Sequence, residues 1–131
     1  DPELEVFGEH SMKGTPGSET IKELQPQQGD HILEKRTYSA FFETGLDLLL
    51  RRLNVDSVVI AGLHTHICCR HTAADAFHRG YGVTLATDCV EALTDEDHNS
   101  GLEYIKTIYN SKSLTSGEII ESWATGAKFK I

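Results

Sequence analysis

A cysteine and a lysine are the residues of this 131-residue chain whose settings favour chemistry. Cys68 follows a β-branched run that ends at Gly62, and we expect it in the first turn of the next helix. Free backbone N–H groups and the helix dipole at that position favour a thiolate, the reactive form of cysteine. Lys35 ends a short apolar stretch, where a partly desolvated ammonium could hold a thiolate or a developing oxyanion. The two side chains are therefore candidates for nucleophilic catalysis.

Each of these residues also has a purely structural interpretation. Most intracellular cysteines are simply buried, so Cys68 could be one of them. Lys35 could be a solvated lysine at the end of a strand, with Phe41 and Phe42 in the core. Cys69 points elsewhere on the expected helix, towards a face of small residues, and is predicted to be a buried structural thiol.

The three cysteines and the nearby histidines do not have the spacing of a disulfide framework or a zinc site. Cys68 and Cys69 are adjacent and would form only a strained bridge, and Cys89 is predicted to be simply buried, like most intracellular cysteines. Zinc ligands usually come in two separated pairs, and adjacent cysteines on one helix cannot both face one ion. We therefore expect no cysteine-ligated structural zinc. Three histidines lie around the cysteine pair: His64, His66 and His71.

Composition and charge narrow the class of partner. With 39% hydrophobic and 24% charged residues the chain is typical of globular proteins, and it has no repeat or composition break, so we expect one domain over residues 1–131. A formal charge of -8 argues against nucleic-acid binding. No apolar run approaches the roughly 20 residues that cross a bilayer, and the acidic N-terminus does not resemble a secretory signal. We expect a cytoplasmic protein with a small-molecule partner and no membrane contact.

Strands and helices alternate along the chain, which predicts an α/β fold. Such an order calls for a parallel sheet with right-handed crossovers and helices on both faces, a three-layer α/β/α arrangement in which each strand is buried on both faces. Ligands of such sheets gather beyond the carboxyl ends of the strands, where we expect Lys35 and Cys68. Residues 1–17 are expected to be a long loop, and Thr44 with Asp47 resembles a helix capping box. Strands are expected at 31–35, 56–62, 82–87 and 112–115, and helices at 18–24, after Thr44, at 95–109 and at 116–122. A further helix is expected after residues 63–65, and it closes near Gly80, which suits the C′ position.

Residues 62–76, GLHTHICCRHTAADA, closely resemble the G-x-x-T-x-x-C-V-x-x-T-A-x-D-A signature of isochorismatase-like cysteine hydrolases. Only Cys69 departs from the signature, in place of valine. The cysteine of the motif is the nucleophile of these enzymes, so the resemblance gives that role to Cys68. Residues 35–41, KRTYSAF, look like the family's K-x-x-Y-S-A-F segment, whose lysine belongs to an Asp-Lys-Cys triad. The resemblance therefore assigns the triad lysine to Lys35.

The resemblance also covers the strand and turn after the signature, but it departs from the family at the start of the chain. The family begins with a strand that carries the triad aspartate, followed by a helix. That strand and helix have no counterpart here, so we expect an N-terminally incomplete domain. We expect that the triad aspartate is not in this chain.

The opening loop resembles a metal-binding segment of nicotinamidase-type members. Residues 8–19, GEHSMKGTPGSE, match G-x-H-x-x-x-G-T-x-G-x-E, in which the histidine is one ligand of a catalytic divalent metal. The resemblance implies His10 as a metal ligand, with zinc as a candidate ion. The alternative is a loop histidine that only forms hydrogen bonds.

The family chemistry implies hydrolysis of a small amide or ureide through a thioester, with release of ammonia. The oxyanion would be held by the backbone N–H groups of His64 and Cys68, next to a cis peptide expected at Leu63–His64. Nicotinamide and N-carbamoylsarcosine types of substrate fit this chemistry. Isochorismate is the alternative within the family, but the cysteine weighs against it because hydrolysis of an enol ether does not need one. A catalytically silent binding module is the alternative outside it, and the family also implies self-association.

Overall fold

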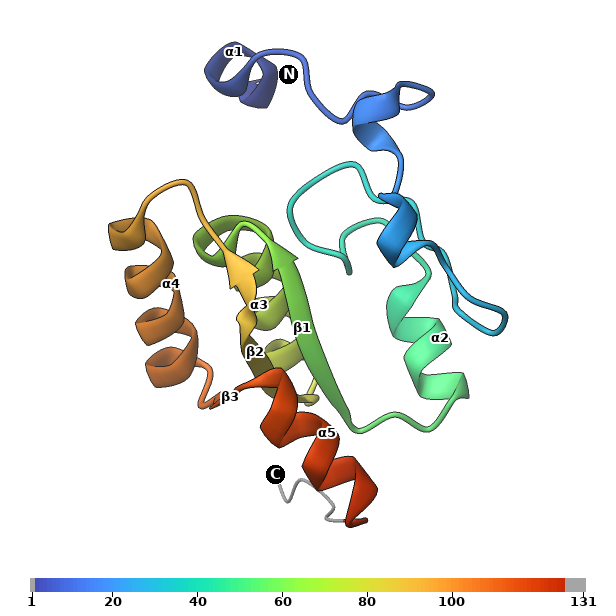
Figure 1. Ribbon diagram of the computed structural model, residues 1–131, viewed down its shortest axis with the longest axis vertical. Coiled ribbons are helices and arrows are strands. Elements are labelled where there is room, and N and C mark those ends of the chain that lie inside the picture. The colour runs from blue at the N-terminus through green and yellow to red at the C-terminus, as the bar shows by residue number, and fades with distance from the viewer. Residues whose placement is uncertain (1, 127–131) are drawn as a thin grey trace. The chain divides into compact units, whose positions relative to one another are not determined.

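The computed structural model describes residues 2–126, and the chain divides into two compact units, Asp1–Ile32 and Leu33–Ile131. The first unit contains a short helix, α1 (Pro2–Phe7), and two 3-10 turns, η1 (Pro16–Ser18) and η2 (Lys22–Leu24) (Figure 1).

The prediction for the first unit is wrong in two places. Residues 2–7 form a helix where a loop is expected, and proline is well accommodated in the first turn of a helix. The helix expected at residues 18–24 is replaced by η1 and η2. Ile21 and Leu24 are 60% and 70% exposed, so this stretch buries no apolar face that would hold a longer helix together.

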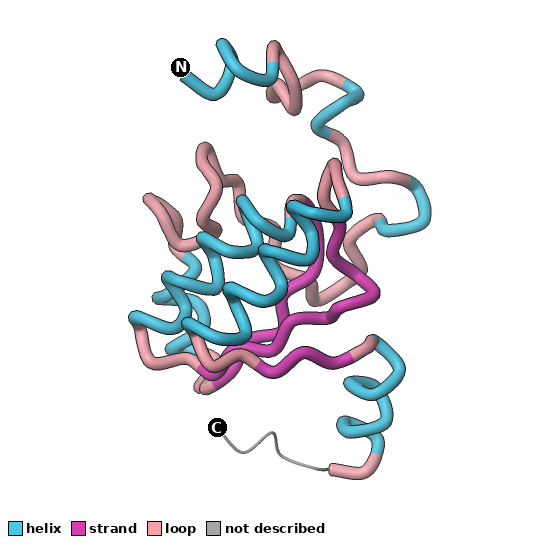
Figure 2. Tube along the Cα trace, turned by 90° about the vertical axis from the view of Figure 1, so that its left-hand side faces the viewer, coloured by secondary structure: helices cyan, strands magenta, loops and turns pink. Residues whose placement is uncertain are grey.

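The second unit is built on a parallel sheet of three strands in the order β1-β2-β3. α3 and α4 pack on one face of the sheet and α5 on the other (Figures 1 and 2), which confirms the predicted α/β/α class. The elements are α2 (Leu46–Arg52), β1 (Ser57–Leu63), η3 (Thr65–Cys69), α3 (Arg70–His78), β2 (Gly82–Glu91), α4 (Asp95–Ile108), β3 (Lys112–Leu114) and α5 (Ser116–Ala124).

The strand expected at residues 31–35 is not formed. These residues are irregular and exposed, with the Leu33 side chain 41% accessible. An apolar stretch becomes a strand when a neighbouring strand satisfies its backbone hydrogen bonds, and this stretch pairs with none of the three strands of the sheet. Lys35 therefore lies on a loop.

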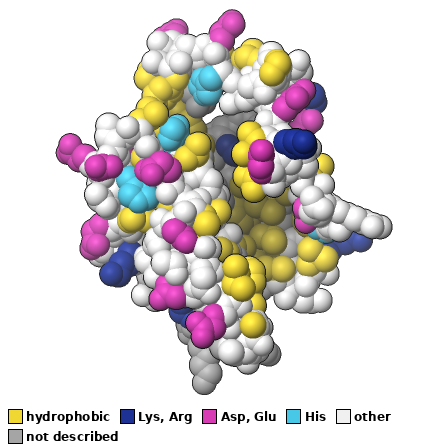
Figure 3. Space-filling model, viewed as in Figure 1, with side chains coloured by type: hydrophobic (Ala, Val, Ile, Leu, Met, Phe, Trp, Pro, Cys, Tyr) yellow, Lys and Arg dark blue, Asp and Glu magenta, His cyan; other side chains and the backbone are white. Residues whose placement is uncertain are grey.

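β1 stands at one edge of the sheet, and only part of it is buried. The strand prediction is confirmed, but the expected burial on both faces is wrong. Ile60 is 8% exposed, whereas Val59 is 38% and Leu63 61% exposed. Hydrophobic side chains gather in a hollow beside this strand on the face seen in Figure 3. Burial of an edge strand depends on what lies next to it, which its own sequence does not contain.

The ends of the helices follow local sequence signals, with one exception. α3 ends in a Schellman motif, in which Gly80 has a φ of 83° and the Tyr81 N–H donates to the Ala76 carbonyl at 3.0 Å, so the predicted C′ glycine is confirmed. The capping box expected at Thr44 is not formed. α2 begins after Gly45, and the Asp47 carboxylate accepts a hydrogen bond from the Tyr81 hydroxyl at 2.8 Å instead.

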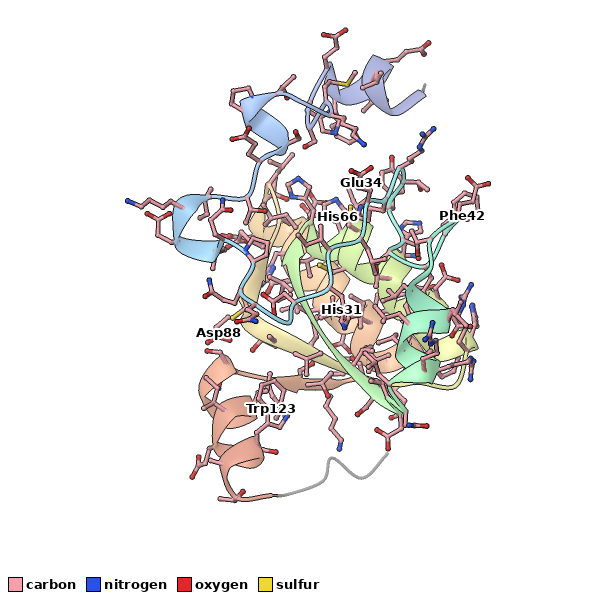
Figure 4. The ribbon with its side chains drawn as sticks, turned by 90° about the vertical axis from the view of Figure 1, so that its right-hand side faces the viewer. His31, Glu34, Phe42, His66, Asp88 and Trp123 are labelled. Atoms are coloured by element: carbon pink, nitrogen blue, oxygen red, sulfur yellow. The ribbon has the colours of Figure 1, made fainter. Side chains whose placement is uncertain are left out.

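The hydrophobic core lies between the sheet and the helices on the α3 side. α5 is tied to the opposite side by Asp88 at the carboxyl end of β2, which accepts hydrogen bonds from the Ser116 amide at 2.7 Å and hydroxyl at 2.6 Å (Figure 4). Among residues 2–126, no helix has both the length and the apolar character needed to span a membrane. The buried core residues are Phe41, Ile60, Cys69, Ala73, Ala76, Tyr81, Val83, Leu85, Val90 and Ile105.

Candidate active site

Cys68 lies in a single π-helical turn, η3, which joins β1 to α3. The amides of Cys69 and Arg70 each donate to a carbonyl five residues earlier, which is the hydrogen-bond pattern of a π turn. Such turns occur frequently at functional sites. The turn brings Cys68 to the carboxyl end of β1, the edge of a parallel sheet where ligands bind.

The peptide that leads into this turn has the expected cis geometry, at Leu63–His64. The His64 carbonyl accepts hydrogen bonds from the amides of Ile67 at 3.1 Å and Cys69 at 3.2 Å, the residues on either side of Cys68. The backbone around Cys68 is thus held by bonds that do not involve the Cys68 side chain.

The loop segment 35–41 is attached to one face of the helix formed by η3 and α3. The helix positions are separated by three or four residues, the spacing that places side chains on the same face. This face both presents the cysteine and holds the loop that carries Lys35. The four contacts pair Lys35 with Cys68, Tyr38 with His71, Ala40 with Thr72, and Ser39 with Asp75.

The Lys35 ammonium lies 3.9 Å from the Cys68 sulfur, although the two residues are 33 positions apart in the sequence. It also donates to the Thr37 carbonyl at 2.8 Å. Cys68 is partly buried, whereas Lys35 is exposed, which agrees with the solvated lysine of the structural interpretation and not with a partly desolvated one. The thiol therefore sits beside a solvated cation.

Cys69 occupies the opposite environment and is confirmed as a buried thiol. It is 3% exposed, and its sulfur lies 3.5 Å from the Gly62 carbonyl. Burial, followed by the negative charge of a neighbouring Cys68 thiolate, raises the pKa of Cys69 to about 11. Cys69 is consequently protonated at neutral pH and unreactive. All three cysteines are free thiols, and Cys89 is exposed, so the expectation that it is buried is wrong.

The two phenylalanines of the loop segment have different environments. Phe41 is 5% exposed, stacks on Tyr81 at 6.0 Å between ring centroids, and lies under the Arg79 guanidinium at 5.0 Å. Phe42 is 54% exposed and points outward (Figure 4), so the expectation that both are core residues is half right. Phe41 anchors the end of the segment in the core.

Asp75 is a second anchor of the loop segment 35–41. Its place in the signature does not by itself indicate this role. Its carboxylate accepts a hydrogen bond from the Ser39 hydroxyl at 2.5 Å and forms an ion pair with Arg79. Burial acts to raise the pKa of Asp75, but the hydrogen bonds from Ser39 and Arg79 outweigh it and hold the pKa below its ordinary value. The ionised carboxylate is therefore the form that the folded protein stabilises.

Replacing Asp75 with asparagine is expected to lower the free energy of unfolding at pH 7 by about 1–3 kcal/mol, the cost of losing hydrogen bonds to a partly buried charge. Because the folded pKa is lowered, the carboxylate contributes its stability above its ordinary pKa of 3.8, and this contribution disappears as the pH falls through the folded value. Urea unfolding of both proteins at pH 7 and pH 3 measures the difference. A gap between the two proteins that is equally large at both pH values would contradict this account.

Gly101 in α4 is a residue of the site that the sequence analysis missed. It is buried, and a Cβ atom built there would lie 2.9 Å from the Cα and the backbone nitrogen of His66. His66 belongs to η3 and lies at the carboxyl end of β1 (Figure 4). The glycine thus allows α4 to pack directly on the backbone of the turn that carries Cys68.

Gly101→Ala is expected to destabilise the protein by about 1–3 kcal/mol, because backbone atoms cannot yield to the added methyl group. This cost exceeds the roughly 1 kcal/mol that alanine gains over glycine inside a helix. Gly117→Ala in α5 is the matched control, since nothing lies within 4 Å of the added atom and its stability should be unchanged or slightly raised. Thermal unfolding of both variants makes the comparison, and a stable Gly101→Ala protein would rule out the close packing.

His10 belongs to the first unit and does not by itself form a metal site. Its Nδ1 lies 2.8 Å from the Gly8 carbonyl, and its ring packs edge-on against Phe7. Within residues 2–126, no group of three or more histidine, cysteine, aspartate or glutamate side chains is arranged to hold a metal ion. The donors described here do not fit a complete site, so we assign no step to a metal, and the ligand role of His10 stays a prediction.

A family model described as the isochorismatase domain matches residues 1–116. The chain belongs to the isochorismatase family.

Relatives of this isochorismatase-family chain include several proteins named for amide or ureide hydrolysis. The crystal structure of N-carbamoylsarcosine amidase from Thermoplasma acidophilum is 44% identical, with a TM-score of 0.80 over 88% of this chain and 65% of that one. Nicotinamidase 3 of Arabidopsis thaliana is 38% identical over 72% of this chain and 49% of its own length. Ureidoacrylate amidohydrolase of Acinetobacter baylyi is 38% identical over 87% of this chain and 46% of its own. The chain thus spans about half the length of these two curated relatives.

Proposed function

We propose that the protein hydrolyses a carbon–nitrogen bond of a small amide or ureide, with Cys68 as the nucleophile and ammonia as a product. The observation that carries the proposal is the contact between the Lys35 ammonium and the Cys68 sulfur at 3.9 Å. A cation at this distance attracts the negative charge that a sulfur nucleophile carries, and a nucleophilic cysteine works together with a neighbouring group of this kind. The buried neighbour, Cys69, has no such access.

The reaction takes place in two stages. The Cys68 thiolate attacks the carbonyl carbon, and the electron pair of the C=O bond moves to oxygen, where the N–H groups of His64 and Cys68 hold the oxyanion. When the carbonyl re-forms, the C–N bond breaks, and the nitrogen takes up a proton from the solvent and leaves as ammonia. Water then cleaves the thioester, which gives a carboxylic or carbamic acid and regenerates the thiol. Lys35 stabilises negative charge throughout without transferring a proton.

The names of the relatives support amides and ureides as the substrate class. Nicotinamide carries a primary amide and N-carbamoylsarcosine a ureide, and both have a carbonyl that a thiolate attacks. Isochorismate is an enol ether and lacks such a carbon–nitrogen bond. A cysteine held beside a lysine therefore favours the amide class.

The test is release of ammonia from nicotinamide and from N-carbamoylsarcosine, each measured with and without a chelator. Release from either compound would support the proposal, and its loss on chelation would support His10 as a metal ligand. Iodoacetamide labelling at neutral pH is run in parallel, and Cys68 should react well ahead of both the buried Cys69 and the exposed Cys89. Absence of ammonia together with an unreactive Cys68 would overturn the proposal in favour of a binding module.

A further inference from the structure

His71 makes a hydrogen bond that bears on the peptide next to Cys68. Its Nδ1 lies 2.7 Å from the Ile67 carbonyl oxygen, one helical turn earlier. A carbonyl oxygen only accepts hydrogen bonds, so Nδ1 must carry the proton and donate it. The imidazole is therefore held in a defined orientation on the backbone of η3.

The Ile67 carbonyl and the Cys68 N–H belong to the same peptide unit. This unit is planar, so a donor that fixes the carbonyl also fixes the direction of the N–H on its other side. Hydrogen bonding at the carbonyl also polarises the peptide and makes its N–H a stronger donor. That N–H is one of the two groups proposed above to hold the oxyanion.

Two further observations show that His71 contacts the loop segment and does not belong to the core. Its ring packs against Tyr38 with centroids 5.3 Å apart, and Tyr38 lies on the loop segment that carries Lys35. His71 is itself exposed, so its side chain fills no space in the interior. The imidazole thus joins the Lys35 segment to the peptide of Cys68 from outside.

We propose that His71 is a positioning residue, which orients and polarises the Ile67–Cys68 peptide so that the Cys68 N–H stabilises the oxyanion. This inference rests on the proposed function. Its effect belongs to the transition state, because the oxyanion forms only there, so His71 should influence kcat and leave KM nearly unchanged.

The experiment compares His71→Leu with His71→Asn. Leucine removes the donor, whereas the side-chain amide of asparagine places an N–H where Nδ1 lies in histidine. We expect His71→Leu to lower kcat about tenfold, less than the hundredfold or more that follows loss of a whole oxyanion donor. His71→Asn should restore most of the rate, with KM similar in all three proteins.

Alkylation of Cys68 by iodoacetamide is the control, since displacement of iodide forms no oxyanion. The alkylation rate should be the same in His71→Leu as in the parent protein. An alkylation rate that falls together with kcat would show that the turn has moved. An unchanged kcat in His71→Leu would show that the peptide needs no support. Either result overturns the role of His71 and leaves the proposed function standing. Lack of turnover by the parent protein on both amides would overturn the proposed function and this inference with it.

Discussion

Replacing Cys68 with alanine is expected to abolish ammonia release from whichever amide the parent protein hydrolyses. Loss of a nucleophile from a catalytic unit of this kind lowers kcat by about 10⁴-fold or more, because no other group can form the covalent intermediate. Ammonia release under substrate saturation measures the effect. The variant should still bind the amide, since the thiol contributes to attack and not to recognition.

Cys69→Ala is the matched control for this experiment. The two thiols are adjacent in sequence, but Cys69 is 3% exposed and its pKa is raised to about 11 by burial. Cys69→Ala should keep most of the activity while losing about 1 kcal/mol of stability to the small cavity that it leaves. Ammonia release at the parental rate by Cys68→Ala, or its loss in Cys69→Ala, would mean that the nucleophile has been assigned to the wrong residue.

Replacing Lys35 with methionine is expected to lower kcat/KM roughly a hundredfold, the size of effect seen when one group that stabilises developing charge is removed. Methionine keeps an unbranched side chain and removes only the cation that lies 3.9 Å from the Cys68 sulfur. Lys35 is exposed, so thermal unfolding of the variant should be nearly unchanged. Steady-state kinetics at neutral pH provides the measurement.

The control is Lys106→Met, which removes an exposed cation from α4. Both variants make the net charge more negative by one, so a general electrostatic effect would reduce their rates equally. A specific role for Lys35 requires a large loss in Lys35→Met and parental kinetics in Lys106→Met. Equal rates in the two variants would remove Lys35 from the mechanism.

The fold could be predicted from the sequence where local patterns and packing agree. β1, β2 and β3 form at or close to the residue ranges where the sequence predicts strands, and Gly80 ends α3 as expected. The predictions of secondary structure fail where tertiary packing overrides the local sequence pattern. Residues 31–35 have the composition of a strand but no neighbour to pair with, and residues 18–24 contain Ile21 and Leu24 but bury neither.

The candidate site could be predicted where it depends on a contiguous motif, and not where it depends on contacts between distant segments. Cys68 and Lys35 were found separately, and the structure places them 3.9 Å apart. The Ser39–Asp75 hydrogen bond joins residues 36 positions apart, and the requirement for Gly101 comes from the backbone of His66 on another helix. No local spacing contains this information, although a glycine inside a helix costs about 1 kcal/mol and is a signal for close packing.

The buried face of α3 determines which of the two neighbouring cysteine side chains can react. Consecutive residues differ by about 100° in direction on an α-helix, and by a smaller angle in a wider π turn such as η3, so rotation alone separates Cys68 from Cys69. Ala73 and Ala76 are fully buried and fix the angular phase of the helix. One residue inserted between Cys69 and Ala73 would leave those alanines in place and move each earlier residue back by one position. Cys69 would then occupy the direction that Cys68 has now, so the choice of thiol is set by helical phase and not by the thiols themselves.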